Sequence, residues 1–260
     1  MHFPSRRSMT MLDGQRARSL AVLALTLALT ACDSEEEEPE PVKCSASPVR
    51  CTEQSIDQLD LLTTPSTMEV REEGTTSGEF LTYVDARAGG LTPTMSYTYV
   101  RFTEQGLTRV DIDDQAALSS TDWDIAFRRY VIRVNSGVSG PSCVSVAKTP
   151  EGTAFGSVTT VNSAWEVKTE TYFTDTCEFV EDESGIGAPA AQLGSYWTYA
   201  GCLAMTGNVF VVTLADGRHV KLEVVSYYDP AVQKACDETG KLPDGPSGSA
   251  QFRVKWAFLK

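Results

Sequence analysis

The chain has 260 residues and a formal net charge of −13 at pH 7. Without its first 31 residues the chain has 229, which lies within the range in which an all-β sandwich or barrel remains one domain. The acidic balance argues against nucleic acid as a partner, because binding to phosphates needs a basic surface.

The first 31 residues have the features of an export signal. The apolar run Leu20–Leu29 is too short to span a bilayer. Four arginines precede it: Arg6, Arg7, Arg16 and Arg18. The run ends in Leu-Thr-Ala-Cys, which resembles the lipobox of bacterial lipoproteins, where the cysteine receives the lipid. We expect cleavage before Cys32 and a lipid on that residue; an ordinary secretory signal or an N-terminal membrane anchor is the alternative.

An acidic stretch follows the proposed lipid site. Residues 33–41 read DSEEEEPEP, in which like charges repel, prolines oppose helix and nothing apolar can be buried. We therefore expect residues 32–43 to be a lipidated, solvated tether for a single folded domain, residues 44–260, in the cell envelope. Asp33 resembles a signal that retains lipoproteins on the inner membrane in some bacteria, so inner and outer membrane both stay open. Without the first 31 residues, which hold four arginines and Asp13, the net charge becomes −16.

The cysteines predict a disulfide framework. Of the seven in the chain, six follow Cys32: Cys44, Cys51, Cys143, Cys177, Cys202 and Cys236. An even number in an exported chain predicts three disulfides, although their pairing cannot be derived from spacing. Chain order favours the local set, in which each cysteine pairs with its neighbour along the chain. A zinc site is disfavoured, because no CxxC occurs and the mature chain holds one histidine, His219.

From Leu59 onward, short alternating runs rich in Val, Thr, Tyr and Phe predict an all-β domain of antiparallel sheets. The strand candidates are Thr67–Arg71, Glu79–Asp85, Ser96–Thr103, Leu107–Ile112, Trp123–Val134, Val144–Lys148, Trp165–Phe173, Tyr196–Ala200, Val209–Leu214, His219–Tyr228 and Gln251–Leu259. The clearest hairpin joins 209–214 to 219–228, because Asp216-Gly217 supplies residues suited to a tight turn. On its second strand Val220, Leu222 and Val224 share one face, which leaves His219 facing water. Two short helices are predicted, at 114–119 and 229–236.

Enzyme chemistry has weak support. A serine triad is disfavoured, because no GxSxG occurs and His219 is the one available base. Carboxylates are abundant, so a glycosidase with two facing acids is not excluded but has no specific signal. The cluster Asp111, Asp113 and Asp114 lacks the glycine and terminal Glu of a calcium loop, and a solvated acidic turn is the better interpretation.

Two blocks carry a resemblance to a known family. Residues 120–136 place Trp123, Ile125 and Phe127 on one face of a predicted strand and continue through Arg-Arg-Tyr to a glycine-containing loop. This block resembles the Trp-Asp-x-Ala-x-x-Arg-Tyr strand of the HmuY-like family of bacterial haem-binding lipoproteins. A second block, 209–228, is similar to that family's late hairpin and closing Ser-Tyr-Tyr. With Tyr97–Phe102 and the terminal Phe252–Phe258, the resemblance covers most of residues 79–260.

The resemblance implies an all-β fold that grips haem between loops, with iron held by two His or Met side chains from the segments between the two blocks. Here the sequence departs from the family, because residues 135–208 hold no histidine and one methionine, Met205. We expect Met205 to act with Met95 or His219, or one ligand to act with stacking aromatic side chains. The candidate aromatic residues are Tyr196, Trp197 and Tyr199. Core packing is the alternative interpretation of Met205 and of the aromatic cluster.

Three functions follow from these patterns. The first is capture of haem or a porphyrin by a lipid-anchored protein of the cell envelope. The second is a scaffold of the same fold that binds a different small ligand or a protein through loops 137–142 and 181–195. The third, a glycosidase, ranks last, and we predict a protein that is not an enzyme and has no metal site apart from haem.

Overall fold

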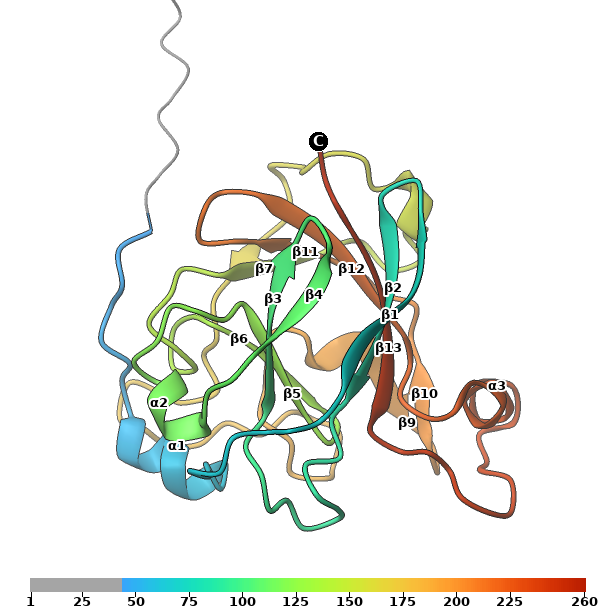
Figure 1. Ribbon diagram of the computed structural model, residues 1–260, viewed down its shortest axis with the longest axis horizontal. Helices are drawn as coiled ribbons and strands as arrows, with labels where there is room; N and C mark the ends of the chain where they lie inside the picture. Colours follow the sequence, from blue (N-terminus) through green and yellow to red (C-terminus); the bar gives the residue numbers. More distant parts are fainter. Residues whose placement is uncertain (1–43) are drawn as a thin grey trace, which may run out of the picture. The chain divides into compact units, whose positions relative to one another are not determined.

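The structure is a computed structural model and describes residues 44–260 (Figure 1). The predicted signal peptide 1–31, the lipid site Cys32 and the tether 32–43 lie outside the described residues. Within 44–260, no helix is long and apolar enough to cross a membrane. The predicted fold class is confirmed, since the chain forms antiparallel sheets with few short helices.

The largest sheet has seven strands in the order β1-β2-β13-β12-β11-β7-β8. In chain order these are β1 (Val70–Thr76), β2 (Glu79–Asp85), β7 (Ser145–Lys148), β8 (Val167–Lys168), β11 (Val209–Thr213), β12 (His219–Ser226) and β13 (Gln251–Phe258). Every neighbouring pair is antiparallel. The predicted hairpin β11–β12 is confirmed, with Val212 opposite Val220 and a positive φ at Gly217 in the turn.

A second sheet has four strands in the order β4-β3-β5-β6, and a third is the hairpin β9–β10. Their strands are β3 (Thr98–Thr103), β4 (Gly106–Val110), β5 (Ile125–Arg128), β6 (Val131–Val134), β9 (Trp197–Tyr199) and β10 (Leu203–Met205). Three α-helices, α1 (Thr52–Gln58), α2 (Asp114–Ala117) and α3 (Pro230–Thr239), and two 3-10 turns, η1 (Phe155–Ser157) and η2 (Gly194–Tyr196), complete the fold. Figure 1 shows α1 and α2 on the side of β5 and β6, and α3 beside β9 and β10.

Alternating side chains divide the interior into layers. Phe210 and Leu222 of the seven-stranded sheet pack with Phe102 and Phe127 of the four-stranded sheet in one apolar cluster, which we call the central core. Val211, the neighbour of Phe210, points to the opposite face and packs in a small outer cluster with Phe155. The two sheets therefore face each other across the central core, as in a β-sandwich.

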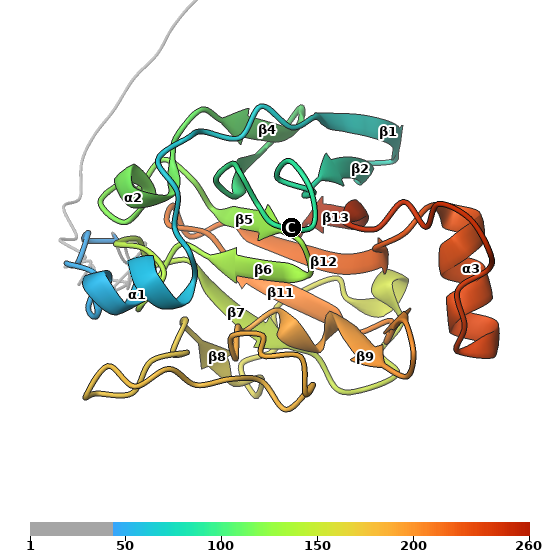
Figure 2. The ribbon, with the colours of Figure 1, turned by 90° about the horizontal axis from the view of Figure 1, so that it is seen from below.

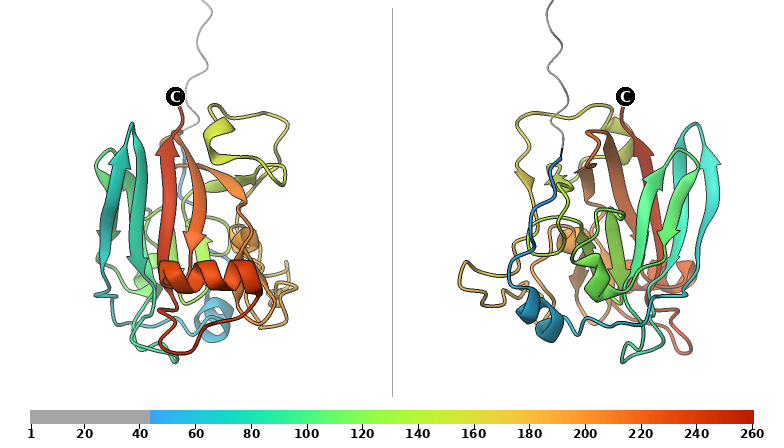
Figure 3. Two further views of the ribbon diagram at one scale, coloured as in Figure 1. Left: turned by 90° about the vertical axis from the view of Figure 1, so that its right-hand side faces the viewer. Right: turned by 60° about the vertical axis from the view of Figure 1, so that its left-hand side comes forward.

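A second buried cluster, the N-terminal cluster, lies on the other face of the four-stranded sheet. It combines Tyr97, Tyr99 and Trp123 with Leu59 and Leu61 from the N-terminal segment. Figure 2 shows that segment, with α1, beside β6, and shows the chain between β7 and β11 on the side of the molecule away from β1. In the left view of Figure 3, α3 lies across the ends of β12 and β13.

Several predicted strand limits are wrong. The run 123–134 is not one strand but the hairpin β5–β6, because Arg129 adopts a positive φ of 51° and reverses the chain. Trp123 lies before β5, between two bends, and packs in the N-terminal cluster rather than with Ile125 and Phe127 in the central core. The predicted strand 165–173 reduces to β8. The alternating pattern could not separate two short strands joined by a turn without glycine.

The disulfides correct the predicted pairing. The structure joins Cys202 to Cys236 as expected, but it joins Cys44 to Cys143 and Cys51 to Cys177. The local set was therefore wrong for two of the three bonds. The N-terminal segment folds back along the four-stranded sheet, so its cysteines meet partners 99 and 126 residues away.

Candidate functional site

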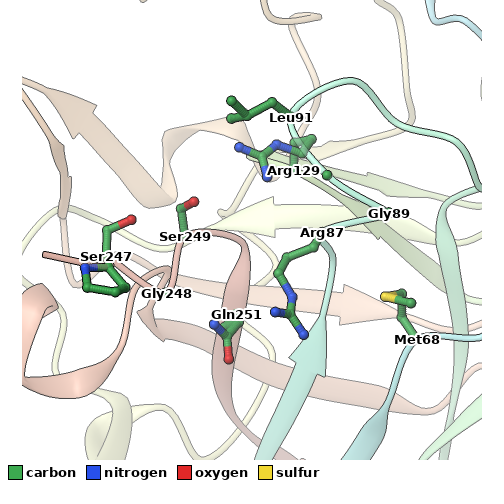
Figure 4. Close-up of a pocket in the computed structure, with 11 residues that line it drawn as sticks. Met68, Arg87, Gly89, Leu91, Arg129, Ser247, Gly248, Ser249 and Gln251 are labelled. Atoms are coloured by element: carbon green, nitrogen blue, oxygen red, sulfur yellow. The ribbon is translucent and has the colours of Figure 1, made fainter.

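A cavity of about 490 Å³ lies at one end of the seven-stranded sheet (Figure 4). It is bounded by the segment after β2, the turn between β5 and β6, and the segment before β13, and its lining includes Met68, Arg87, Leu91, Arg129 and Gln251. Both its size and its mixture of apolar and charged side chains are typical of small-ligand pockets.

A second cavity of about 420 Å³ adjoins the first, because Leu91 and Arg129 line both. Its wall adds the aromatic rings of Tyr97, Tyr130 and Phe179. We call the two cavities together the arginine groove. Leu91 is 86% exposed, so its side chain adds apolar contact area to the groove.

Backbone hydrogen bonds hold the groove in shape. Arg129 and Tyr130 form the two-residue turn between β5 and β6, and the Arg129 N–H donates to the Ala86 carbonyl at 2.7 Å. This bond ties the turn to the segment that follows β2. In that segment Gly89 has a positive φ, and a Cβ there would meet the Thr94 side chain at 2.1 Å, so the close loop requires glycine.

The two guanidinium groups of the groove differ in their pairing. Arg87 forms a bidentate pair with Asp85, whose hydrogen bonds raise the pKa of Arg87. Arg129 has no ion-pair partner within residues 44–260. In the view of Figure 4, Arg87 lies between Met68 on one side and Gln251 on the other, with Arg129 and Leu91 above. The groove therefore presents positive charge on a protein that is acidic overall, which suits a ligand with carboxylates.

The predicted aromatic residues support the groove from behind. The Tyr196 hydroxyl donates to the Tyr130 carbonyl at 2.8 Å, and the Trp197 ring meets the Tyr130 ring edge-on at 6.2 Å. Tyr196 and Trp197 are both buried, so Tyr130 stands between them and the cavity. Tyr199, in contrast, is 52% exposed on β9 and lies outside the groove lining.

The three predicted axial ligands lie apart. Met95 is beside the groove, because its sulfur accepts a hydrogen bond from Thr67, the neighbour of Met68. Met205 lies opposite Trp197 on β10, and its N–H donates to Asp237 of α3. His219 begins β12, where its Nδ1 lies 3.0 Å from the Thr213 hydroxyl. The structure thus places Met95 beside the groove, although it does not line either cavity, and leaves Met205 elsewhere.

The sheet register places His219 far from Met95. Both β2 and β12 pair antiparallel with β13, so they run in the same direction. His219 lies at the start of β12, whereas Met95 follows the end of β2 and therefore lies at the other end of the sheet. Eight residues of strand separate these ends by roughly 25 Å.

Comparison with known proteins identifies the family. Residues 93–239, more than half of the chain, match the family described as HmuY protein. The chain belongs to the HmuY family. No curated protein matches it. Solved structures to which the chain is similar include a HmuY-like protein of Bacteroides vulgatus, named as heme-binding, with 17% identity and a TM-score of 0.46 over 73% of this chain and 97% of that one.

Two further solved structures are similar in the same way. A Bacteroides fragilis protein named as a lipoprotein has 14% identity and a TM-score of 0.44, covering 72% of this chain and 94% of that one. The apo HmuY analog of Tannerella forsythia has 15% identity and a TM-score of 0.39, covering 75% and 100% of the two chains.

The HmuY resemblance implies iron ligands from the segments between the two blocks, and these segments line a further cavity. It measures about 550 Å³ and is built from residues 148–151, 164–168 and 192–195. Its lining holds no histidine, methionine, cysteine or tyrosine. Axial ligation of iron therefore has no donor there, while the arginine groove offers a thioether at Met68.

The acidic cluster 111–114 corrects another prediction. The prediction of a solvated turn is wrong for Asp114, which is fully buried. Asp111 is exposed, and the half-buried Asp113 caps α2 by accepting from the Ala116 N–H at 2.8 Å. Asp114 accepts hydrogen bonds from the Tyr97 N–H and the Tyr99 hydroxyl and pairs with Arg128 at 3.1 Å. Within 44–260, no group of three or more His, Cys, Asp and Glu could hold a metal ion.

Sequence reasoning missed Met68, Arg87 and the role of Arg129. The turn that places Arg129 in the groove lies within the Arg-Arg-Tyr sequence at 128–130. This sequence was interpreted as part of one uninterrupted strand, so the turn was not predicted. Met68 carried no signal, because it reaches the groove through the path of the chain before β1 rather than through any local pattern.

Proposed function

We propose that this chain binds haem or a related porphyrin in the arginine groove, as a lipid-anchored protein of the cell envelope. Membership of the HmuY family carries the proposal, because the family match spans more than half of the chain. Family membership also supports a binding protein rather than an enzyme. The composition of the groove supports it as the haem-binding site, since it combines apolar, aromatic, thioether and cationic side chains.

The groove residues suit the chemistry of haem. A haem offers an iron that accepts axial ligands, a flat apolar ring and two carboxylates. Met68 would supply a thioether, with Met95 beside it as the second candidate ligand. Arg129, which has no ion-pair partner in the described chain, would pair with a carboxylate, and Leu91 would cover the ring. Burial raises the pKa of the Tyr130 phenol, so that side chain stays neutral and serves as an aromatic wall.

A haemin titration tests this proposal. The purified chain with its three disulfides formed should give a saturable Soret shift. Met68→Ala should abolish or displace the band, Arg129→Ala should weaken binding about tenfold, and His219→Ala should leave it unchanged. The Met95→Ala and Met205→Ala variants test the remaining predicted ligands in the same way. No shift at micromolar haemin would overturn the proposal.

A second candidate function rests on the missing donors between the family blocks. A HmuY-family scaffold without iron ligands in that segment would bind a different small ligand or a protein through loops 137–142 and 181–195. The haemin titration separates the two candidates, because this scaffold predicts no Soret shift.

The envelope location rests on the sequence of residues 1–43. We propose cleavage before Cys32 and lipid attachment there, with 32–43 as tether. In cells, wild-type chain should fractionate with membranes, and Cys32→Ala should release it to the soluble fraction. Membrane association of the Cys32→Ala variant would contradict lipid attachment at this residue.

A further inference from the structure

Trp165 lines the cavity of about 550 Å³ that lies at the edge of the seven-stranded sheet. A turn holds it in place: the Trp165 N–H donates to the Asn162 carbonyl at 3.0 Å, and β8 begins two residues later against β7. The indole also packs against the outer cluster around Phe155. Trp165 thus packs against the outer cluster and also lines the cavity, so its ring is held in place as an aromatic surface for a ligand.

Most of the other side chains that line this cavity are polar, and they carry both signs of charge. They include Lys148, Glu151, Glu166, Lys168, Gln192 and Ser195. Lysine donates hydrogen bonds, glutamate accepts them, and glutamine does both. A ligand that satisfies this wall needs many hydroxyl groups rather than a single net charge.

We infer that this cavity is a second binding site, separate from the arginine groove, and that it takes a pyranose ring of a glycan. A pyranose has one face of C–H groups, which suits the electron-rich face of an indole. Its edge carries hydroxyl groups that both donate and accept, which suits the mixed polar wall. A flat apolar ligand would instead cover the charged side chains of the wall without offering them any hydrogen bond.

The geometry favours binding over hydrolysis. The Glu166 side chain is 78% exposed and pairs with Lys168 at 2.9 Å. A general acid of a glycosidase needs a desolvated carboxyl that stays protonated, and an exposed, ion-paired carboxylate does not provide it. The inference therefore concerns recognition of a sugar and no covalent step.

The chain's tryptophans make the test direct. Trp123 and Trp256 are fully buried and Trp197 is 6% exposed, so changes in intrinsic fluorescence on sugar binding report mainly on Trp165. The disulfide-bonded chain is titrated with chitohexaose, maltohexaose and cellohexaose, and each titration is repeated by calorimetry. We expect saturable binding of at least one oligosaccharide at millimolar concentration or below.

Matched variants locate the site. Trp165→Ala should raise the dissociation constant at least about tenfold, which corresponds to about 1.4 kcal/mol, while Trp165→Phe should retain part of the affinity. Tyr199→Ala removes another exposed aromatic side chain outside the cavity and should leave binding unchanged. Failure of all three oligosaccharides to bind, or equal affinity in Trp165→Ala and Tyr199→Ala, overturns the inference. Neither outcome affects haemin binding, which Arg129→Ala tests separately.

Discussion

The central core and the N-terminal cluster lie on opposite faces of the four-stranded sheet and are stabilised in different ways. The central core consists mainly of aliphatic and aromatic side chains, with Phe210, Leu222 and Trp256 fully buried. The N-terminal cluster also buries charge, because Asp114 and Arg133 are completely enclosed. The same sheet thus has one face that depends on apolar burial and one that depends on charge compensation.

The buried charges stand directly behind the arginine groove. The guanidinium groups of Arg128 and Arg133 each lie 4.2 Å from the ring centroid of Tyr97, and Tyr97 and Arg128 line the groove. Asp114 compensates both arginines, at 3.1 Å and 3.9 Å. The central core therefore supplies general stability, while the charged residues of the N-terminal cluster position the wall of the binding site.

Loss of both long-range disulfides should have the largest effect. Both bonds attach the N-terminal segment beside the N-terminal cluster, and they close loops of 99 and 126 residues. Replacing Cys44, Cys51, Cys143 and Cys177 by alanine should lower the free energy of unfolding by roughly 8 kcal/mol, about 4 for each bond. Denaturant titration measures this. Replacing Cys202 and Cys236, which close 34 residues, should cost less than half as much.

Among single substitutions in the N-terminal cluster, Asp114→Asn should lower the free energy of unfolding the most. It removes the charge that compensates Arg128 and Arg133 while leaving both buried, at an expected cost of about 4 kcal/mol. Asp113→Asn is a matched control, because asparagine is an equally good helix cap for α2. Equal stability of the two variants would show that the buried charges need no compensation.

Leu222→Ala tests the central core. Its fully buried side chain leaves a cavity on truncation, which should cost about 3 kcal/mol. Because no charge is involved, this loss should not vary with pH. Val225→Ala, at a half-buried position on the opposite face of β12, should cost clearly less in the same denaturant titration. A pH-dependent loss for Leu222→Ala would break the contrast between the two faces.

Glu170 should make the stability of the folded chain depend on pH. Burial raises the pKa of Glu170 to about 7 from 4.5, although its carboxylate accepts the Val134 and Gln192 N–H groups. As pH rises, Glu170 loses its proton in the unfolded chain near pH 4.5 but in the folded chain only near pH 7. The free energy of unfolding should therefore fall between about pH 4.5 and 7, by about 3 kcal/mol at most, and level off above pH 7.

The Glu170→Gln variant isolates this dependence. It loses one acceptor and should be less stable than the wild-type chain at pH 4.5, but its stability should fall less steeply towards pH 7. Denaturant midpoints at half-unit pH steps measure both slopes. Parallel slopes in variant and wild type would remove Glu170 as the cause.

Residue patterns predicted the seven-stranded sheet better than the binding site. The β2 limits were predicted without error, and the alternation of Val220, Leu222 and Val224 towards the core is confirmed, because one face of β12 packs on apolar side chains. The turn at Arg129 was missed, since positive φ at a residue other than glycine, asparagine or aspartate has no sequence signal. His219 is half-buried rather than simply facing water, because it contacts Thr213 on the neighbouring strand.

The sequence by itself determined the antiparallel β class, the β11–β12 hairpin, the number of disulfides and the family resemblance, because each depends on local spacing or on counts. Tertiary structure alone decided which cysteines pair, that Asp114 is buried, and that Met68, Arg87 and Arg129 meet in one groove. These features join segments separated by tens of residues, and the energy that selects them comes from packing and charge compensation between sheets rather than from any local pattern.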